Sequence, residues 1–202
     1  MRGIMMNIPK DILNKIGEIQ AITDPEEQGC TSQVAFIKTS ERTYALKTSK
    51  DPLFRTWLKN ESYILEHLKD LNLPTPKPFL FIEKDYASWL LMEKLPGRTL
   101  ASALSEEKDE QRRAKLISEF GAVVAQVHSA PAPAALRTAT QPWLESMLAE
   151  AQYNLEHHEV DGSQQLLNQL KATPPTPIEP TLIHGDLTVD NVLTDGRQIT
   201  GH

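Results

Sequence analysis

A segment close to the carboxyl end, TLIHGDLTVDNVLTDG over residues 181–196, contains three polar residues whose types and spacing suit catalysis. Asp186 can accept a proton from an attacking hydroxyl group. Asn191, five residues further on, has a carbonyl oxygen of the kind that Mg²⁺ prefers. We expect the apolar runs TLI and NVL to be short strands that hold His184, Asp186 and Asn191 in a rigid loop. A base and a metal ligand so placed are the parts that phosphoryl transfer needs.

A second candidate pair lies in the first half of the sequence. In TYALKTS, Lys47 shares a strand face with Ala45. Glu61 falls on the apolar stripe of the helix expected after Pro52, a stripe that consists of Trp57, Ile64, Leu65, Leu68 and Leu71. A carboxylate that faces a core needs a cationic partner, so we predict that Lys47 and Glu61 pair inside a cleft. The alternative is that Glu61 lies at the edge of the stripe and Lys47 is solvated.

The loop EEQGCTSQV precedes that strand pair. Gly29 permits a tight turn, and Thr31 and Ser32 add hydroxyl groups to backbone N–H groups that can face an anion. The loop has one glycine where dinucleotide and Walker loops have two or three, and it does not match GxxxxGK[ST]. By itself it is a weak phosphate-binding signal.

The elements that must position these residues can be predicted from their patterns. We expect a short helix capped by Asp11, with Ile12, Ile16 and Ile19 on one face. Alternating runs predict two β-hairpins, residues 32–49 and 78–94, which turn near Ser40–Glu41 and at residues 84–86. The helix between the hairpins should begin with Asp51 as N-cap and Pro52 at its first position. From Leu95 onward the pattern is mainly helical, with helices expected over residues 109–130, 142–159 and 164–170.

The composition of the chain argues against several classes of protein function. The 202 residues are 40% hydrophobic and carry a net charge of −6, which argues against a nucleic-acid footprint and is compatible with a cationic substrate. The single cysteine, Cys30, excludes an internal disulfide and a thiolate-rich zinc site. The longest apolar run, residues 87–92, is far shorter than the roughly 20 residues that span a bilayer. The N-terminus has no signal-peptide core, so we expect a cytoplasmic protein.

The motif HGDLTVDN resembles the catalytic loop H-R-D-x-x-x-x-N of protein kinases. With Gly185 in place of the arginine, it is more similar to the aminoglycoside phosphotransferase and choline kinase families, which share the kinase-like fold. The other parts follow in the same order: a glycine-containing loop, the lysine of YALK, the glutamate of LKNESYIL, a hinge-like LLMEKLPGRTL and a helix that ends in VHS. The resemblance implies an α+β, protein-kinase-like fold with two lobes. Residues 1–94 would form a nucleotide-binding lobe with a small antiparallel sheet and one helix, and residues 95–202 a mainly helical, incomplete lobe.

The same resemblance implies roles for individual residues. Lys47 would contact the α and β phosphates of ATP or GTP, with Glu61 holding it in place. Gly29, Thr31 and Ser32 would lie over the phosphates. The adenine pocket would be formed by Met92 behind the base, the Glu93 carbonyl and the Leu95 N–H. Asp186 would be the base or the orienting group for the hydroxyl of a small-molecule acceptor, Asn191 a Mg²⁺ ligand, and His184 a residue that ties the loop down.

One part of the kinase-like set is missing from the sequence. The second metal-binding Asp, the counterpart of the Asp in DFG, would be expected after RQITGH, and Asp195 falls in a turn. We therefore expect a C-terminally shortened chain that transfers phosphate very slowly or not at all, and apolar faces exposed by such shortening would favour self-association. Two other functions stay open: a pseudokinase-like module that binds nucleotide or a partner, and a metal-dependent hydrolase that uses His184 and Asp186.

Overall fold

The computed structural model describes residues 7–25, 28–29, 31–137, 143–176 and 181–202. Its contacts divide the chain into two compact units. The first unit consists of residues 1–130 together with residues 182–202, and the second of residues 131–181. All the candidate site residues named above belong to the first unit.

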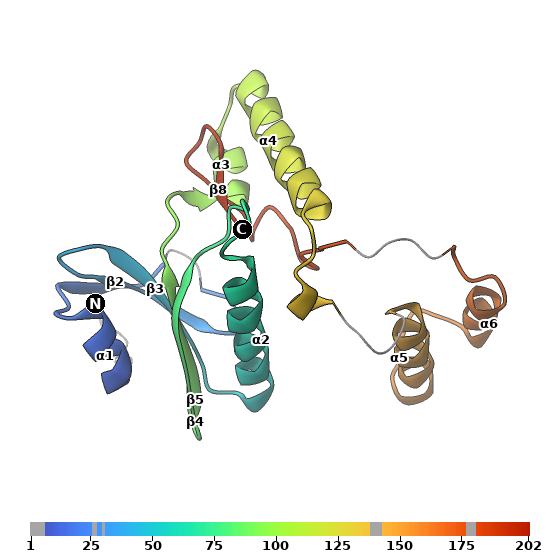
Figure 1. The fold of residues 1–202 in the computed structure, drawn as a ribbon. Helices are drawn as coiled ribbons and strands as arrows, with labels where there is room; N and C mark the ends of the chain where they lie inside the picture. Colours follow the sequence, from blue (N-terminus) through green and yellow to red (C-terminus); the bar gives the residue numbers. More distant parts are fainter. Residues whose placement is uncertain (1–6, 26–27, 30, 138–142, 177–180) are drawn as a thin grey trace. The chain divides into compact units, whose positions relative to one another are not determined.

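A five-stranded antiparallel sheet is the centre of the first unit (Figure 1). Its strand order is β1-β2-β3-β5-β4, with bounds Ala21–Thr23, Gln33–Lys38, Thr43–Ser49, Ala87–Glu93 and Pro78–Lys84. Both predicted hairpins are confirmed, β2 with β3 and β4 with β5. The edge strand β1 is an addition that the sequence did not suggest, because its three residues are all exposed and show no alternation.

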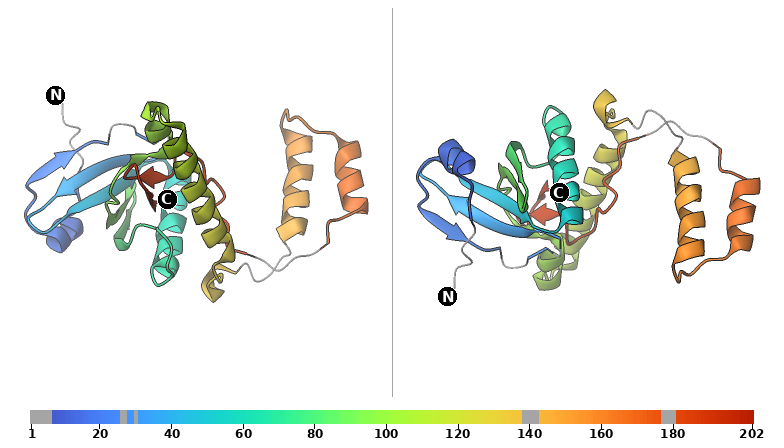
Figure 2. Two further views of the ribbon diagram at one scale, coloured as in Figure 1. Left: turned by 90° about the horizontal axis from the view of Figure 1, so that it is seen from above. Right: turned by 90° about the horizontal axis from the view of Figure 1, so that it is seen from below.

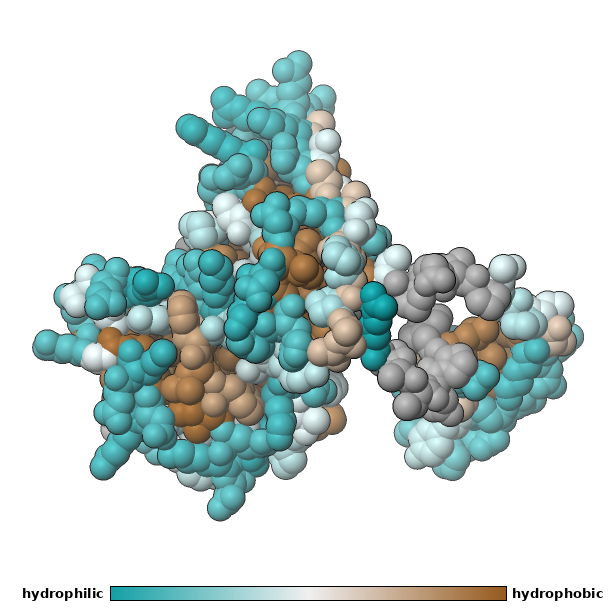
Figure 3. Space-filling model, viewed as in Figure 1, coloured by the Kyte–Doolittle hydropathy of each residue, from teal (hydrophilic) through white to brown (hydrophobic). Residues whose placement is uncertain are grey.

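Two helices cover opposite faces of this sheet, α1 (Lys10–Ile16) and α2 (Pro52–Leu68) (Figure 1). Successive side chains of β5 point to opposite faces of the sheet, so this strand contributes to the core on both faces. Ala87, Trp89 and Leu91 pack with α1 in one buried cluster, while Leu90 and Met92 pack with α2 in another. A strand that is apolar on both faces is expected at the centre of a covered sheet. Hydrophobic residues therefore gather over these strands within a hydrophilic surround (Figure 3).

Two details of these helices differ from the prediction. In α2 the buried residues are Leu58, Leu65 and Leu68, whereas Trp57 is 50% exposed and Ile64 41% exposed. The predicted positions Leu65 and Leu68 are confirmed, whereas Leu58 and not Trp57 faces the sheet in the first half of the helix. Asp51 does cap α2, accepting from the N–H groups of Leu53 and Phe54. Asp11 does not cap α1, since that helix begins at Lys10 with Pro9 at its N-cap and no side-chain cap.

A small second sheet includes the two strands that follow the HGDLTVDN motif. Its strands are β6 (Arg98–Thr99), β7 (Leu193–Thr194) and β8 (Ile199–Gly201), in that order. Helices α3 (Leu100–Glu106) and α4 (Glu110–Ser129) accompany it, and β8 lies beside α4 (Figure 2). Their shared core contains the buried side chains Leu100, Ala103, Leu116 and Val192. The strand predicted for TLI is wrong: residues 181–183 are not in a strand, and Ile183 is 61% exposed.

The second unit is a helical hairpin. It contains a short 3₁₀ turn η1 (Ala134–Leu136), α5 (Trp143–His157) and α6 (Gln164–Ala172), and the two long helices lie side by side (Figure 2). Gln152 of α5 bonds Gln164 and Lys171 of α6. The predicted helices are thus confirmed. Within the described ranges, no helix combines the length and apolarity that crossing a bilayer requires.

Candidate functional site

The predicted pairing of a strand lysine with a helix acid is present. Lys47 on β3 and Glu61 on α2 form an ion pair, with Nζ and Oε1 2.6 Å apart. Their side chains are 27% and 34% exposed, so the pair lies at the edge of the α2 stripe and still meets water. Ala45, on the same strand face, packs under α2 beside the pair, as the alternation predicted.

Two basic residues of α2 fix that helix on the sheet and thereby position Glu61. The guanidinium of Arg55 donates to the backbone carbonyls of Lys84 and Asp85 in the β4–β5 turn, and to the hydroxyl of Ser88. One turn further along, Lys59 donates to Glu83 at 2.8 Å. The hydrogen bond from Lys59 lowers the pKa of the Glu83 carboxyl, so the acid stays charged. The orientation of α2 is therefore set by contacts outside the pair itself.

The loop around Asp186 is held by its own backbone and by one amide. The Asp186 carbonyl accepts from Thr188 N–H at 3.1 Å, and the Thr188 carbonyl accepts from Asn191 N–H at 3.1 Å. The Asn191 side-chain nitrogen donates to the Asp186 carbonyl at 3.0 Å and to its carboxylate at 2.8 Å. Gly185 has a φ of +86°, a backbone conformation that favours glycine. Asp186 is exposed, so its carboxylate is open to a substrate.

The donor set of Asn191 fits a cation. Both of its side-chain bonds to Asp186 use the amide nitrogen, which leaves the amide oxygen available as a ligand. A neutral amide oxygen is among the hard donors that Mg²⁺ accepts. No group of three or more His, Cys, Asp or Glu side chains gathers as a metal site within the described residues.

His184 has two neighbours. Its Nδ1 accepts from the Asp186 N–H at 3.3 Å, which ties the start of the loop to Asp186. Its ring lies edge to face with that of His202, the ring centres 5.2 Å apart. Burial and then the nearby His184 lower the pKa of His202 to about 4, and neither of its ring nitrogens has a hydrogen-bond partner among the described residues. His202 is thus neutral in the folded protein near pH 7.

The glycine-containing loop is closed by a residue that the sequence reasoning missed. The Gln28 side chain pairs with the backbone of Val34, its Nε2 donating to the carbonyl and its Oε1 accepting from the N–H, both at 2.8 Å. The Thr31 carbonyl accepts from the Ser49 hydroxyl at 3.1 Å, which fastens the loop to β3. A glutamine before a glycine is too common to have signalled this role.

The residues that the resemblance assigns to the nucleobase of the nucleotide lie where β5 ends. Met92 is 6% exposed on the α2 side of the sheet. The Glu93 N–H donates to the Lys77 carbonyl at 2.9 Å. Leu95 packs against β8, since a Cβ added at Gly201 would lie 2.0 Å from Leu95 Cδ1. The segment after β5 and the strand that follows the catalytic loop are therefore in direct contact.

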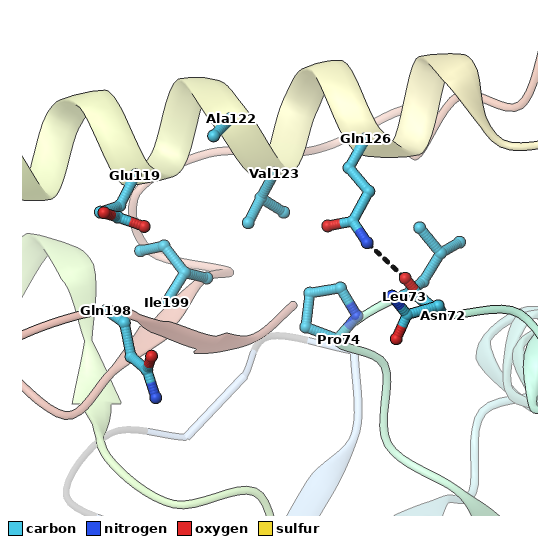
Figure 4. Close-up of a pocket in the computed structure, with 9 residues that line it drawn as sticks. All are labelled: Asn72, Leu73, Pro74, Glu119, Ala122, Val123, Gln126, Gln198 and Ile199. Atoms are coloured by element: carbon cyan, nitrogen blue, oxygen red, sulfur yellow. Dashed lines mark hydrogen bonds between the residues drawn. The ribbon is translucent and has the colours of Figure 1, made fainter.

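The segment between α2 and β4, residues 69–77, forms a joint that connects the first sheet with the part of the chain around the Asp186 loop. Gln126 of α4 donates to the Asn72 carbonyl (Figure 4). The His202 N–H donates to the Pro74 carbonyl at 3.0 Å. A cavity of about 360 Å³ lies beside this joint, between α4 and β8. No hydrogen bond or ion pair of the described residues links the Lys47 pair directly to the Asp186 pair, so this joint and the contact of Leu95 with β8 are the indirect connections between them.

Asp195 lies in the β7–β8 turn, as expected. Its carboxylate accepts from the N–H groups of Arg197 and Gln198, at 2.8 and 3.0 Å. The bonds from Gln198 and then Arg197 lower its pKa. This side chain is used to close the turn.

A two-faced antiparallel sheet with a lysine–glutamate pair, followed by helices and a loop with a paired Asp and Asn, defines a kinase-like α+β architecture. Residues 25–201 match the family described as the phosphotransferase enzyme family, so the chain belongs to that family. The match covers the second sheet, every strand of the first sheet except β1, and both residue pairs.

The relatives point the same way. The chain is 29% identical over 152 residues to an aminoglycoside 3'-phosphotransferase of Streptomyces fradiae, covering 68% of this chain and 53% of that protein. The chain thus spans about half the length of this curated relative.

Solved structures share the fold. An aminoglycoside phosphotransferase APH(4)-Ia in complex with AMP-PNP and hygromycin B has a TM-score of 0.69 at 18% identity, covering 95% of this chain and 68% of that one. A type VIII aminoglycoside-3'-phosphotransferase has a TM-score of 0.58 at 23% identity, covering 88% of this chain and 68% of that one.

Proposed function

We propose that the protein transfers the γ-phosphate of ATP or GTP to a hydroxyl group of a small cationic molecule. The observation that carries this proposal is the double hydrogen bond from Asn191 to Asp186, which holds the exposed carboxylate of Asp186 and uses only the amide nitrogen of Asn191, so that the amide oxygen stays available to a cation. Membership of the phosphotransferase enzyme family supports the reaction class. The APH(4)-Ia complex, which contains AMP-PNP, supports nucleotide as the donor.

In the proposed reaction Asp186 takes the proton of the acceptor hydroxyl as its oxygen attacks the γ-phosphorus, and the bond from that phosphorus to the β–γ bridging oxygen breaks. The ammonium of Lys47, held by Glu61, offsets charge on the α and β phosphates. Mg²⁺, when bound at the Asn191 oxygen, would neutralise further phosphate charge. Gly29, Thr31 and Ser32 would cover the phosphates with N–H and hydroxyl groups.

The base of the nucleotide is assigned to the end of β5. Met92 would lie behind it, and the backbone carbonyl of Glu93 and N–H of Leu95 would bond its edge. This gives the first sheet the donor nucleotide and leaves Asp186 to face the acceptor.

A cationic acceptor is supported by charge. Residues 131–181 contain six acidic and two basic residues. The five acidic residues of this unit that the structure describes are all exposed: Glu145, Glu150, Glu156, Glu159 and Asp161. The curated relative is an aminoglycoside 3'-phosphotransferase, and aminoglycosides are polycationic amino sugars. We propose this class as the acceptor.

Calorimetric titration with Mg-ATP and Mg-GTP tests the donor half of the proposal. We expect binding that Lys47→Met weakens about tenfold or more, because the substitution removes a charge that contacts phosphate. Lys50→Met is the matched control, since Lys50 is exposed just beyond β3. A folded protein that binds neither nucleotide would contradict the proposal.

Transfer of labelled γ-phosphate to a panel of acceptors tests the other half. The panel pairs an aminoglycoside with a neutral sugar and an amino alcohol. We expect label in the cationic acceptors, and label only in the neutral sugar would contradict the acceptor class. The same assay measures whether transfer is slow. Three expectations stay predictions: slow or absent phosphate transfer, self-association, and the absence of nucleic-acid partners.

A further inference from the structure

The cavity beside the joint has apolar walls (Figure 4). Val123 of α4 lies on one side of it, and Ile199 of β8 and Pro74 of the joint lie on the other. Val123 is buried, and Ile199 and Pro74 are half-buried. The volume of about 360 Å³ is at the small end of the range for pockets that bind small molecules. The cavity therefore fits an apolar group of limited size.

A carboxylate lies at one end of these apolar walls. Glu119 is on α4, one turn before Val123, and its side chain extends from the helix beside Ile199 (Figure 4). The residue is half-buried, and it has no hydrogen-bond or ion-pair partner among the residues that the structure describes. A partly desolvated carboxylate without a partner favours a cation beside it.

The basic residues nearest in the sequence do not fill this place. None of the described residues that line the cavity is a lysine or an arginine. Lys115, four residues before Glu119, is exposed, and a lysine that precedes a glutamate at this spacing is the weaker order for a helical ion pair. Arg197 in the β7–β8 turn is exposed and does not line the cavity. The carboxylate is thus open to a cation from outside the chain.

The polar group at the other end is also an acceptor. Gln126 donates through its Nε2 to the Asn72 carbonyl, which leaves its Oε1 as the free atom of the amide. This oxygen points toward the middle of the cavity (Figure 4). Since a carboxylate and an amide oxygen both accept hydrogen bonds, the cavity suits a hydrogen-bond donor and disfavours an anion.

We propose that this cavity is a binding site for a small organic amine, whose ammonium lies against Glu119 and whose apolar part lies between α4, β8 and the joint. The ammonium donates charge-assisted hydrogen bonds to the carboxylate, and burial of the apolar part removes its surface from water. Neither the Lys47 pair nor the Asp186 pair lines the cavity, so this site is separate from the one proposed for phosphate transfer.

Other occupants would leave different signatures. A carboxylate that attracts any cation by charge alone takes ethylamine as well as 2-phenylethylamine. An apolar cavity that is indifferent to charge takes 2-phenylethanol as well as 2-phenylethylamine. The proposed site needs both the ammonium and the apolar part, so these three compounds separate the possibilities.

The experiment titrates the full chain with each compound, without nucleotide, and follows backbone ¹H–¹⁵N correlation spectra. We expect 2-phenylethylamine to shift the amide signals of Leu73, Val123 and Ile199, with a Kd of about 0.1–1 mM for a ligand of this size. Ethylamine and 2-phenylethanol should bind at least about fivefold more weakly, since each lacks one of the two parts. No shifts, shifts confined to the acidic second unit, or equal affinity for either smaller probe would overturn the proposal.

Glu119→Gln tests the charge. Glutamine keeps the length of the side chain and removes the charge, so the affinity for 2-phenylethylamine should fall about fivefold or more, whereas that for 2-phenylethanol should not change. Glu110→Gln is the matched control, because Glu110 lies exposed on the same helix and does not line the cavity. An equal loss in the two variants would mean that general charge attracts the amine, and would overturn the proposal.

Ala122→Leu tests the location. Ala122 lines the cavity, so the larger side chain should fill part of it and abolish binding of 2-phenylethylamine. Ala125→Leu is the control, since Ala125 is exposed on the same helix outside the cavity and its substitution should leave the affinity unchanged. Unchanged affinity in a folded Ala122→Leu variant would overturn the proposal. Because no titration contains nucleotide, a parent protein that binds no nucleotide would refute the proposed function and leave the amine site standing.

Discussion

The Lys47–Glu61 pair and the Asp186–Asn191 pair are positioned in different ways. Lys47 lies on a central strand of a five-stranded sheet, and Glu61 on a helix of 17 residues that packs on that sheet. Asp186 and Asn191 lie in a loop with no regular structure, held by turns and by their own hydrogen bonds.

This difference separates two kinds of dependence. The geometry of the first pair depends on a buried core that also stabilises the fold, whereas that of the second depends on local backbone contacts at the surface. Substitutions in the loop should therefore change chemistry with little effect on stability, and substitutions that disturb the supporting elements should change both.

Asp186→Asn should give the largest effect. Asparagine keeps an oxygen that can accept from Asn191 but is not basic, so we expect the transfer rate to fall about 10²–10⁴-fold relative to the parent. Because Asp186 is exposed, Tm should move by less than about 2 °C. Steady-state rates and a thermal melt measure the two, with the exposed Asp190→Asn as control. A rate within tenfold of the parent would show that Asp186 is not the base.

Gly97→Ala should be the largest change in stability. Gly97 has a φ of +106°, and a Cβ there would lie 2.3 Å from the Thr194 carbonyl oxygen, so β6 and β7 must move apart. We expect a loss of about 2–4 kcal/mol in the free energy of unfolding. Gly185→Ala is the matched control, because its φ is +86° with nothing within 4 Å, and it should cost only about 1 kcal/mol. Urea unfolding measures both, and equal losses would contradict the comparison.

Much of the first region could be predicted, because its patterns are local. Period-two alternation located both hairpins, and a charge on an apolar stripe identified Glu61 as the partner of Lys47. The stripe was predicted in part: Leu65 and Leu68 are buried, but Leu58 and not Trp57 faces the sheet. Trp57 and Leu58 are adjacent and both apolar, so helical periodicity does not decide which of them faces the sheet.

The parts that escaped prediction rely on contacts between residues far apart in the sequence. Gln126 reaches a backbone carbonyl at Asn72, and carbonyl partners leave no mark on a sequence. Gln28 likewise bonds the backbone N–H and carbonyl of Val34, partners that no pattern in the sequence marks. The catalytic motif could be recognised, but the short strand expected before it does not form.

Glu61→Gln should lower nucleotide affinity, an effect smaller than those of Asp186→Asn and Gly97→Ala. Glutamine keeps the length of the side chain and removes the charge that holds Lys47, so we expect nucleotide affinity to fall about tenfold. The free energy of unfolding should change by less than about 1 kcal/mol, since the pair is partly exposed. Glu66→Gln is a close control, because Glu66 lies on the same helix in an exposed ion pair with Lys69. An equal loss of affinity in both variants would mean that general charge, and not the position of Lys47, matters.

The smallest effect should come from His202, through the pH dependence of the free energy of unfolding. Burial and His184 lower the pKa of His202 from 6.5 to about 4 in the folded protein. The unfolded chain then binds more protons between these values, so this contribution to stability is present above pH 6.5 and is lost as the pH falls toward 4.

Between pH 7 and pH 5 the shift corresponds to a loss of about 1–2 kcal/mol. His202→Phe keeps a ring beside His184 but cannot be protonated, so its free energy of unfolding should fall less over the same interval. Urea unfolding of both proteins at the two pH values measures the difference, and other titrating groups cancel because they are common to both. Parallel losses would mean that His202 reaches water when it is protonated, and that the contact between β8 and the start of the loop is looser than the ring geometry indicates. A smaller loss in the variant would show that part of the loop's support comes from a buried neutral ring, in contrast with the charged pair on the first sheet.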